Sequence, residues 1–524
     1  MVNLIPQPLH VDEKVGGVFF SKKTELSGAF AEIFDVLKTM LPEAEDAEEN
    51  KLIFAEDKTV PAEGYHIACE DGDIKITASD KAGAFYGVMT LLQLCGGADS
   101  FDAVEIEDAP RYHHRGFMLD CARHFWTVDK IKQILDVMAK IKMNIFHWHL
   151  TEDQGWRIEI KKYPLLTEKG SIRKSTALTF TGYEEHKEPR DYTEYGRGLF
   201  YTQDQVRDVV AYAAERQINI IPEIEMPGHF VAAIACYPEL SCTGEQVEVS
   251  DRWGVLDNIA CCGKENIYNF VKDIIDELCE LFPYPYFHIG GDEVPKGHWE
   301  VCPACQAKIK ELGLKDENAL QGYFNNVVSD YLKSKGKHTV GWNEILEASE
   351  NLDRSIIPQW WILMEGSNRE KQWLDDGGKM ILSLVDYVYM DHPYAIRPLE
   401  KTYSYGPEKM GITDDSNVLG IEAPQWTEYI RDEEKFDMNT YARLLAIAEV
   451  AWTAPENKDY DDFESRLEHL REYFASIGAV LAPSWIYRGD TLGEVPEEER
   501  IEAGWKAWRD DSYFEVKLMN RTNS

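Results

Sequence analysis

Segments typical of strands and segments typical of helices alternate through most of this 524-residue chain. Short apolar runs recur eight times, and stretches with apolar residues at helical spacing fall between most of them. The strand candidates are Gly116–Asp120, Asn144–Leu150, Asn219–Glu225, Tyr286–Asp292, Thr339–Glu344, Ser355–Trp361, Met380–Asp391 and Val418–Trp426. The helix candidates are Val128–Lys142, Gln203–Arg216, Asn266–Leu281, Asn318–Ser334, Asn368–Asp376 and Asn439–Trp452. This alternation over roughly 340 residues predicts an α/β fold, a (β/α)8 TIM barrel.

A doubly wound open sheet is the alternative arrangement of alternating strands and helices. Nucleotide-binding sheets of that kind carry a Gly-x-Gly-x-x-Gly turn after a strand, and none of the strand candidates is followed by one. We therefore prefer the barrel, with Gly116–Asp120 and Ser355–Trp361 as its least secure strands. Thr202 and Gln205 have the spacing of a capping box, which predicts a helix start there.

The chain before and after the alternating region is different in character. Short strand candidates at Val15–Phe20, Lys51–Phe54, Gly64–Cys69 and Asp73–Ala78 precede a helix candidate at Asp80–Cys95. Glu105–Pro110 then resembles a linker, and the chain from Tyr460 onward is polar and partly helical. We expect a small α+β domain at residues 1–106, the barrel at residues 107–457, and a short, appended C-terminal tail at residues 458–524.

The charge balance limits the partners of the protein. Acidic residues outnumber basic ones by 93 to 55, a net charge of −38, whereas nucleic acids and anionic membranes need a basic footprint. We therefore expect neither as a partner, and the oligomeric state stays open, with a homodimer as one candidate. The N-terminal residues lack a basic segment followed by an apolar core. We expect a cytoplasmic protein, or a secreted one if a leader has been removed.

Adjacent carboxylates follow one of the apolar runs, at Asp292-Glu293. Neighbouring side chains on a strand point to opposite faces, but Gly290-Gly291 allows the chain to bend. Both carboxylates can then converge on one pocket, and paired acids in different environments carry out glycoside hydrolysis. A solvated acidic turn is the alternative interpretation.

Polar and aromatic residues collect at the same end of six strand candidates. The segments are His147–Asp153, Glu223–His229, Asp292-Glu293, Trp342–Glu344, Tyr389–Asp391 and Trp426–Glu428. In a barrel these ends share the C-terminal face, where active sites are built. His147 and His149 have the spacing of a metal pair, which leaves a metal-dependent hydrolase open as an alternative. We favour histidines that are hydrogen-bonded in the core, and we expect neither a cofactor nor a catalytic metal.

Ten cysteines are too few for a disulfide scaffold in a chain of this length. Cys302 and Cys305 have metal-ligand or redox spacing, and Cys261, Cys262 and Cys242 could complete a zinc site if their side chains converge. We favour reduced thiols near a helix start.

Five segments together resemble the β-N-acetylhexosaminidases of glycoside hydrolase family 20. They occur in the family's order between about Ala109 and Trp452, and are Arg115–Phe125, Asn144–Thr151, Pro222–His229, His288–Glu293 and Gly420–Glu428. The resemblance implies a barrel that follows an α+β module. It implies exo-acting release of terminal β-linked N-acetylglucosamine or N-acetylgalactosamine, in which the substrate's acetamido oxygen is the nucleophile. A relative that releases a disaccharide or a modified sugar, and a sugar-binding protein without turnover, are the alternatives.

The resemblance also implies roles for individual residues. Glu293 is expected to be the general acid, protonated near the working pH, while Asp292 holds the acetamido N–H and Tyr389 its carbonyl oxygen. The residues expected to bind sugar hydroxyls are Arg115, Asp391 and Glu428. The tryptophans expected to wall the pocket are Trp342, Trp361 and Trp426, with Trp360 competing for the place of Trp361.

A second group of residues is expected to lie behind Glu293 and to tune it as an acid. His229, paired with Glu152 or Asp153, and His288 belong to this group. The family usually has two aspartates where this chain has Glu152-Asp153, and an aspartate at the position of Asn343. An extra methylene moves a carboxylate by about one bond length, which can matter in catalysis. The loop at residues 176–197 is a candidate for the pocket rim.

Overall fold

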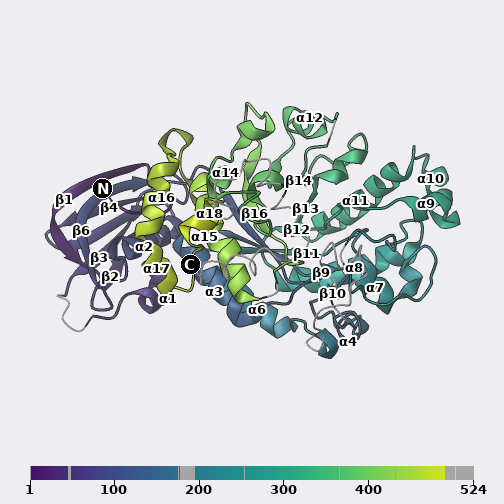
Figure 1. The fold of residues 1–524 in the computed structure, drawn as a ribbon, viewed down its shortest axis with the longest axis horizontal. Coiled ribbons are helices and arrows are strands. Elements are labelled where there is room, and N and C mark those ends of the chain that lie inside the picture. Colours follow the sequence, from purple (N-terminus) through teal and green to yellow (C-terminus); the bar gives the residue numbers. More distant parts are fainter. Residues whose placement is uncertain are drawn as a thin grey trace.

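The computed structural model describes residues 2–44, 49–174, 176, 195–252, 254–364, 366–430, 432–489 and 502 (Figure 1). Most of the candidate rim loop, residues 177–194, lies outside the described residues. Among the described residues, no helix combines the length and the apolar character that crossing a membrane requires.

Eight parallel strands close into a barrel, which confirms the predicted fold. In barrel order the strands are β7 (His114–Asp120), β8 (Ile145–His149), β11 (Asn219–Glu223), β12 (Tyr286–His288), β13 (His338–Trp342), β14 (Ile357–Trp360), β15 (Met380–Leu382) and β16 (Val418–Gln425). The last strand pairs with the first, Gly420 lying opposite His114 and Gln425 opposite Leu119. The main helices around it are α3 (Val128–Lys140), α6 (Gln203–Glu215), α8 (Glu265–Leu281), α11 (Glu317–Ser334), α12 (Arg369–Asp375) and α15 (Glu433–Trp452).

Helices α3 and α6 begin at capping threonines and bury one face against the barrel. In α3 the buried residues include Ile131, Ile134 and Met138, which recur at helical spacing. Thr127 caps this helix by accepting a hydrogen bond from the backbone N–H of Lys130. The capping box predicted at the start of α6 is present in both directions, between Thr202 and Gln205.

The seventh strand is much shorter than predicted. Only Met380–Leu382 pairs with β14 and β16, and the chain then forms the short helix α13 (Val385–Val388). The prediction of a strand to Asp391 was wrong because the apolar run continues through a helical turn that is itself packed on the barrel. This turn carries the chain to Tyr389 and Asp391.

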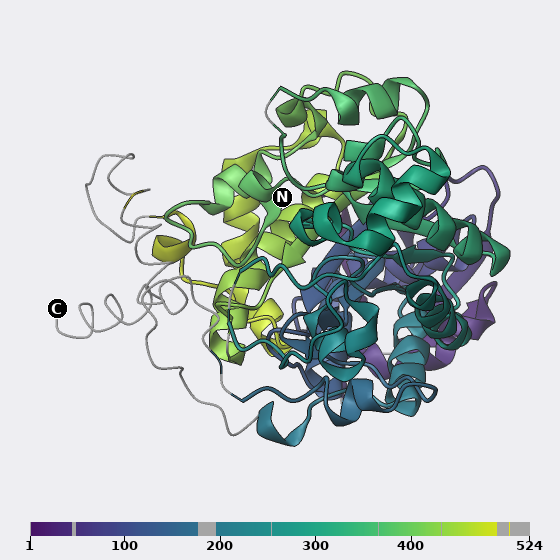
Figure 2. The same cartoon turned by 90° about the vertical axis from the view of Figure 1, so that its right-hand side faces the viewer.

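Short elements occupy the connections between the barrel strands and the main helices. They are β9 (Thr151–Glu152), β10 (Gly155–Trp156), α4 (Leu165–Glu168), η2 (Tyr195–Arg197), α7 (Val231–Cys236), η3 (Pro238–Leu240), α9 (Gly297–Val301), α10 (Pro303–Leu312), η4 (Asn343–Ala348), α14 (Leu399–Tyr403) and η5 (Pro407–Met410). Helices α9 and α10 lie at one end of the long axis of the molecule, and the N-terminal sheet lies at the other (Figures 1 and 2).

The N-terminal α+β unit contains a six-stranded sheet in the order β1-β6-β4-β5-β3-β2. Its elements are β1 (His10–Phe19), β2 (Glu25–Gly28), η1 (Ala31–Ile33), α1 (Phe34–Met40), β3 (Lys51–Glu56), β4 (Tyr65–Glu70), β5 (Asp73–Ala78), α2 (Lys81–Cys95) and β6 (Ser100–Asp108). The linker expected from Glu105 was wrong, because strand β6 continues to Asp108 and pairs with both β1 and β4.

The N-terminal unit packs against the amino ends of the first two barrel strands. Glu63 accepts hydrogen bonds from Arg115, at the start of β7 (2.8 Å), and from Asn144, just before β8 (3.0 Å). Asp108 forms a fully buried ion pair with Lys142 (2.9 Å). The carboxyl ends of the strands, at the other end of the barrel, therefore stay free to build a site.

The described C-terminal helices, up to residue 489, pack into the structure, whereas most of the predicted tail beyond them lies outside the described residues. These helices are η6 (Pro455–Asn457), α16 (Tyr460–His469), α17 (Arg471–Ser476) and α18 (Ser484–Tyr487), and they lie beside α15 and the N-terminal unit (Figure 1). Phe463, Leu467 and Phe474 are completely buried. These side chains cover apolar surface, which explains why the polar composition alone misrepresented the segment.

Candidate active site

A cavity of about 260 Å³ opens among the carboxyl ends of the barrel strands. The predicted site residues that line it are His229, Asp292, Glu293, Trp361, Tyr389, Asp391, Trp426 and Glu428. A larger cavity of about 450 Å³ lies between the N-terminal unit and α17, and none of the predicted site residues lines it. We therefore place the candidate active site in the smaller cavity.

The turn after β12 brings the two acids into the cavity. The strand ends at His288, and Gly290 and Gly291 follow with φ angles of 67° and 93°. A Cβ atom on Gly290 would lie 1.7 Å from Oε2 of Glu225, so this position has room for glycine alone. Glu293 is itself left-handed, with a φ of 48°. Such strain in a residue other than glycine is typical of functional sites, and the bend predicted at Gly290-Gly291 is confirmed.

His229 lies behind the acid pair and approaches both carboxylates with the same nitrogen. Its Nε2 is 3.7 Å from Oδ2 of Asp292 and 3.5 Å from Oε2 of Glu293. Burial lowers the pKa of His229, but the carboxylates around it, chiefly Glu152 and Asp153, outweigh this effect and raise the pKa well above its usual value. His229 is therefore a cation beneath two acids.

Asp292 and Glu293 have different surroundings although they are neighbours in sequence. Asp292 is 7% exposed, and its burial raises its pKa to about 7, with the Glu293, Glu223 and Glu152 carboxylates adding to the rise and His229 opposing it. The side chain of Glu293 is 40% exposed. A water-poor environment around Glu293 therefore requires a ligand that covers it.

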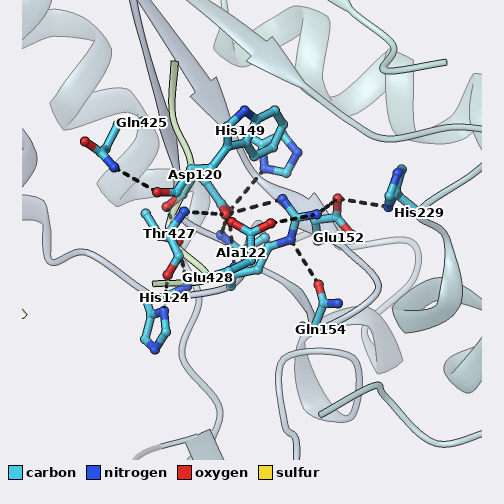
Figure 3. Close-up of polar contacts among 12 residues, drawn as sticks. Asp120, Ala122, His124, His149, Glu152, Gln154, His229, Gln425, Thr427 and Glu428 are labelled. Atoms are coloured by element: carbon cyan, nitrogen blue, oxygen red, sulfur yellow. Dashed lines mark hydrogen bonds and ion pairs between the residues drawn. The ribbon is translucent and has the colours of Figure 1, made fainter. Parts of the chain in front are cut away.

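Glu152 and Asp153 both face His229, so the two alternatives for its partner are realised together. Nδ1 of His229 is 3.1 Å from Oε1 of Glu152 (Figure 3). The same nitrogen is 3.6 Å from Oδ2 of Asp153. The same Oε1 of Glu152 lies 2.5 Å from Nη2 of Arg123. The longer glutamate side chain thus contacts a histidine and an arginine at once.

Aromatic rings form one wall and the floor of the cavity. Tyr389 stacks on Trp361, with ring centres 5.8 Å apart and planes 19° apart, and Trp426 lies 6.2 Å from Tyr389. Trp342, which was expected to wall the pocket, does not line the cavity: it is buried beneath Trp426, with ring centres 5.7 Å apart, and donates a hydrogen bond to Glu223. The ambiguity between the adjacent tryptophans is resolved, because Trp360 is buried and bonds to the carbonyl of Ile362 outside this cavity.

Arg115 is not in the cavity, and its assignment to sugar binding was wrong. It lies at the amino end of β7, completely buried, and contacts Glu63 and Tyr86 of the N-terminal unit. Arg123 of the same motif lines the cavity instead, with Nη2 3.8 Å from Oε1 of Glu428. Arg115 is the second residue of β7 and Arg123 follows the carboxyl end of this strand, so the rule that sites lie at carboxyl ends could have identified Arg123.

Asp120, at the end of β7, fixes the backbone around Arg123. Its carboxylate accepts hydrogen bonds from the backbone N–H groups of Ala122 (2.8 Å) and Thr427 (3.2 Å), and lies 3.4 Å from His149 (Figure 3). These contacts join the first strand to the last at the rim of the cavity. Arg123 and Glu428 are positioned by this junction.

Glu344 is a residue of the site that the prediction left without a role. Its carboxylate accepts a hydrogen bond from the indole N–H of Trp361 (2.7 Å). Burial raises the pKa of Glu344 to about 8, and Asp292 adds to the rise. The acidic residue that follows Trp342-Asn343 at a strand end was the signal available in the sequence.

His288 lies in the barrel interior and supports the site only indirectly. Nδ1 of His288 is 2.7 Å from Oε1 of Glu223, the same oxygen that accepts from Trp342. His147 lies between Glu223 (3.1 Å) and Glu422 (2.7 Å), and all of these side chains are completely buried. His288 remains a supporting residue, because its Nδ1 also accepts a hydrogen bond from the backbone N–H of Gly290 (3.1 Å), in the turn that carries the acids. His147 and His149 are core histidines paired with carboxylates, as we favoured.

Comparison with known proteins identifies the family. The catalytic-domain model of glycosyl hydrolase family 20 matches residues 112–455, and the model of the family's domain 2 matches residues 1–109. A β-hexosaminidase of Porphyromonas gingivalis is 37% identical over 516 residues, which cover 89% of this chain and 62% of that protein. The chain thus spans less than two thirds of the length of this relative.

Solved structures agree with this match. The β-N-acetylhexosaminidase of Bacteroides fragilis has a TM-score of 0.81 and 31% identity, covering 94% of this chain and 99% of that one. An exo-β-N-acetylglucosaminidase of Vibrio harveyi, solved with N-acetylglucosamine, has a TM-score of 0.79 and 31% identity, covering 92% of this chain and 78% of that one. The chain belongs to glycosyl hydrolase family 20.

Proposed function

We propose that this protein is an exo-acting β-N-acetylhexosaminidase. It releases terminal, β-linked N-acetylglucosamine or N-acetylgalactosamine from glycans and retains the anomeric configuration, with the substrate's acetamido group as the nucleophile. The names of the relatives support the activity. The geometry of the acid pair supports the mechanism.

The placement of Asp292 and Glu293 on one side of the cavity carries the proposal. Both carboxylates approach the same nitrogen of His229, and their oxygens lie within 4.8 Å of each other. A two-carboxylate retaining enzyme needs its acid and its nucleophile on either side of the glycosidic bond. Two carboxylates on one side cannot divide that work between them, which supports a nucleophile supplied by the substrate.

The chemistry then divides between the two acids. The carboxyl group of Glu293 gives its proton to the glycosidic oxygen while the acetamido oxygen attacks the anomeric carbon and the aglycone leaves. Asp292 accepts the acetamido N–H and stabilises the positive charge of the oxazolinium ion. In the second step water attacks the anomeric carbon and gives a proton to the Glu293 carboxylate. The oxazolinium ring opens, and the carboxylic acid of Glu293 is restored. Two inversions give net retention.

The aromatic wall holds the acetamido group during this attack. The hydroxyl of Tyr389 donates to the carbonyl oxygen and aims it, while Trp361 and Trp426 pack on the methyl group and ring, with Trp342 beneath them. Arg123, Asp391 and Glu428 line the same cavity and bind sugar hydroxyls. A cavity of about 260 Å³ suits one sugar residue, which supports exo action.

The decisive variant is Glu293→Gln, which keeps the size of the side chain and removes its proton. We expect kcat on an aryl N-acetyl-β-glucosaminide to fall by about 10²- to 10⁴-fold with an unchanged unfolding midpoint. Glu300→Gln, an exposed change in α9 of the same loop, should keep full activity. Wild-type activity in Glu293→Gln would disprove the assignment of the acid.

A thiazoline that mimics the oxazolinium intermediate tests the nucleophile. We expect it to inhibit the wild-type protein competitively and far more tightly than N-acetylglucosamine does. Equal inhibition by the two compounds would contradict substrate assistance. Binding of N-acetylglucosamine without colour release from any aryl hexosaminide would indicate a sugar-binding protein instead.

A further inference from the structure

Four cysteines from three separate segments meet behind the active-site loops. Cys242 follows η3, Cys261 precedes α8, and Cys302 and Cys305 lie at the start of α10. Their sulfur atoms all lie within 4.8 Å of one another. Cys261, Cys302 and Cys305 are buried and Cys242 is partly buried.

The distances between the sulfur atoms match a tetrahedral zinc site. Sγ of Cys261 is 3.7 Å from that of Cys302 and 3.6 Å from that of Cys305, which lies 3.8 Å from that of Cys242. Zinc–sulfur bonds of about 2.3 Å give a tetrahedron with edges of about 3.8 Å. Disulfide sulfurs would be about 2.05 Å apart, and all ten cysteines of the chain are free.

Not every nearby cysteine belongs to the cluster. Cys262 is next to Cys261 and completely buried, yet it is not among the four converging residues, and its carbonyl accepts a hydrogen bond from Tyr268. The spacing of Cys302 and Cys305 at a helix start is that of a zinc-binding pair. Four thiol groups that face one another form only weak hydrogen bonds, because the S–H group is a weak donor.

The cluster lies where two catalytic loops touch. Gly263 packs against the backbone of Ala304 and Cys305, and a Cβ atom on Gly263 would lie 2.3 Å from that backbone. The indole N–H of Trp299 donates to the carbonyl of Ala260 (2.9 Å), and the N–H of Ala260 donates to the carbonyl of Pro227 (2.9 Å). Pro227, Ala260 and Gly263 belong to the loop after β11, which also carries His229. Trp299, Ala304 and Cys305 belong to the segment after β12, which also carries Asp292-Glu293.

We propose that Cys242, Cys261, Cys302 and Cys305 bind one structural zinc ion that joins the loop after β11 to the loop after β12. Binding releases the four thiol protons to solvent and leaves a tetrathiolate site with a net charge of −2. Four protein ligands complete the tetrahedron, so the ion has no open position for substrate. None of the four cysteines lines the active-site cavity, and the ion takes no part in the reaction.

Metal analysis of the wild-type protein is the first test. The protein should be purified under reducing conditions without a metal-affinity column, and its zinc measured by plasma mass spectrometry. We expect one zinc ion per chain, with four sulfur neighbours at about 2.3 Å by X-ray absorption. A chain that stays free of zinc after reduction and incubation with zinc salt, or that joins these cysteines in disulfides, overturns the proposal.

Variants identify the ligands. Cys305→Ser should lose the zinc and unfold at a lower temperature, whereas Cys279→Ser, on α8 outside the cluster, should keep one zinc per chain. Should Cys305→Ser not fold, a chelator added to the wild-type protein should lower its unfolding midpoint, and zinc should restore it. Full zinc content in Cys305→Ser, or a midpoint that does not respond to loss of zinc, overturns the proposal.

Discussion

Arg123 brings positive charge to the acidic side of the cavity. Its guanidinium contacts Glu152 at 2.5 Å and Asp120 at 3.4 Å, and its central carbon lies 5.0 Å from the centre of the Trp426 ring. A planar fork can satisfy these partners and still present an N–H group to a sugar hydroxyl. A lysine ammonium cannot stack and donate in the same way.

We therefore expect Arg123→Lys to lower kcat/KM on an aryl hexosaminide by about 100-fold, equivalent to about 2.7 kcal/mol. The matched control is Arg115→Lys, eight residues earlier in the same motif. Because Arg115 contacts the N-terminal unit and not the cavity, this change should lower the unfolding midpoint and preserve the activity of the folded fraction. Loss of activity in Arg115→Lys, with full activity in Arg123→Lys, would instead identify Arg115 as the sugar ligand.

The burial of Asp292 costs stability at neutral pH. Its pKa is about 7 in the folded protein, against a usual value of 3.8. The folded state therefore binds the proton more tightly than the unfolded state does. Between about pH 4 and about pH 7 the unfolded chain gives up this proton while the folded protein keeps it, so the free energy of unfolding falls by an amount on the order of a few kcal/mol as the pH rises.

Asp292→Asn should remove this cost together with most of the activity. The variant and the wild type should unfold at similar temperatures near pH 4, and the variant should become the more stable of the two as the pH rises to about 7. Calorimetry across this range measures the difference. A gap that does not change with pH would mean that Asp292 ionises in the folded protein as it does in water.

At the level of elements, the turn after β12 is the most constrained part of the site. We expect Gly290→Ala to destabilise the protein by several kcal/mol and to reduce activity, because the new methyl group meets Glu225 at a left-handed position. Gly297→Ala, at the start of α9, meets nothing within 4 Å and should be nearly neutral. Unfolding curves and kcat for both variants check this.

The sequence was sufficient for the barrel because periodicity and buried apolar runs are local properties. It failed at the seventh strand, where Leu384 and Val385 continue an apolar run whose helical turn is set by packing. It failed also at Glu105–Pro110, because pairing of β6 with β1 and β4 depends on distant strands.

The residues of the site also divide into those that local sequence predicts and those that depend on packing. Asp292, Glu293 and Tyr389 could be found because a barrel gathers strand ends, whichever helices surround it. The choice between Arg115 and Arg123 depended on which end of β7 each occupies, and the choice between Trp360 and Trp361 on which way each ring points. The sharing of Glu152 between His229 and Arg123 required coordinates.

At the scale of the whole molecule, Arg466 fastens three parts of the chain together. From α16 it forms two hydrogen bonds of 2.8 Å to Glu449 of α15, and it donates to the carbonyl of Leu4 near the N-terminus. Glu449 is completely buried and Arg466 is 3% exposed. Removal of the arginine would leave a buried charge without its partner.

Arg466→Ala should therefore destabilise the protein by about 3–5 kcal/mol. Arg488→Ala removes a comparable pair with Glu464, but that arginine is half exposed, so its loss should cost at most about 1 kcal/mol. Denaturant unfolding of both variants measures the contrast. Equal effects would show that the contact with α15 contributes no more than an exposed pair.

The closure of the barrel by β7 and β16 has a consequence for synthesis on the ribosome. These partner strands are roughly 300 residues apart in sequence, and such distant contacts form slowly. Until β16 emerges, β7 and β15 are unpaired edges with apolar faces, and unpaired edges of this kind favour aggregation. The barrel therefore cannot close until β16 has been made, and slow translation before residue 418 prolongs the exposure of these edges.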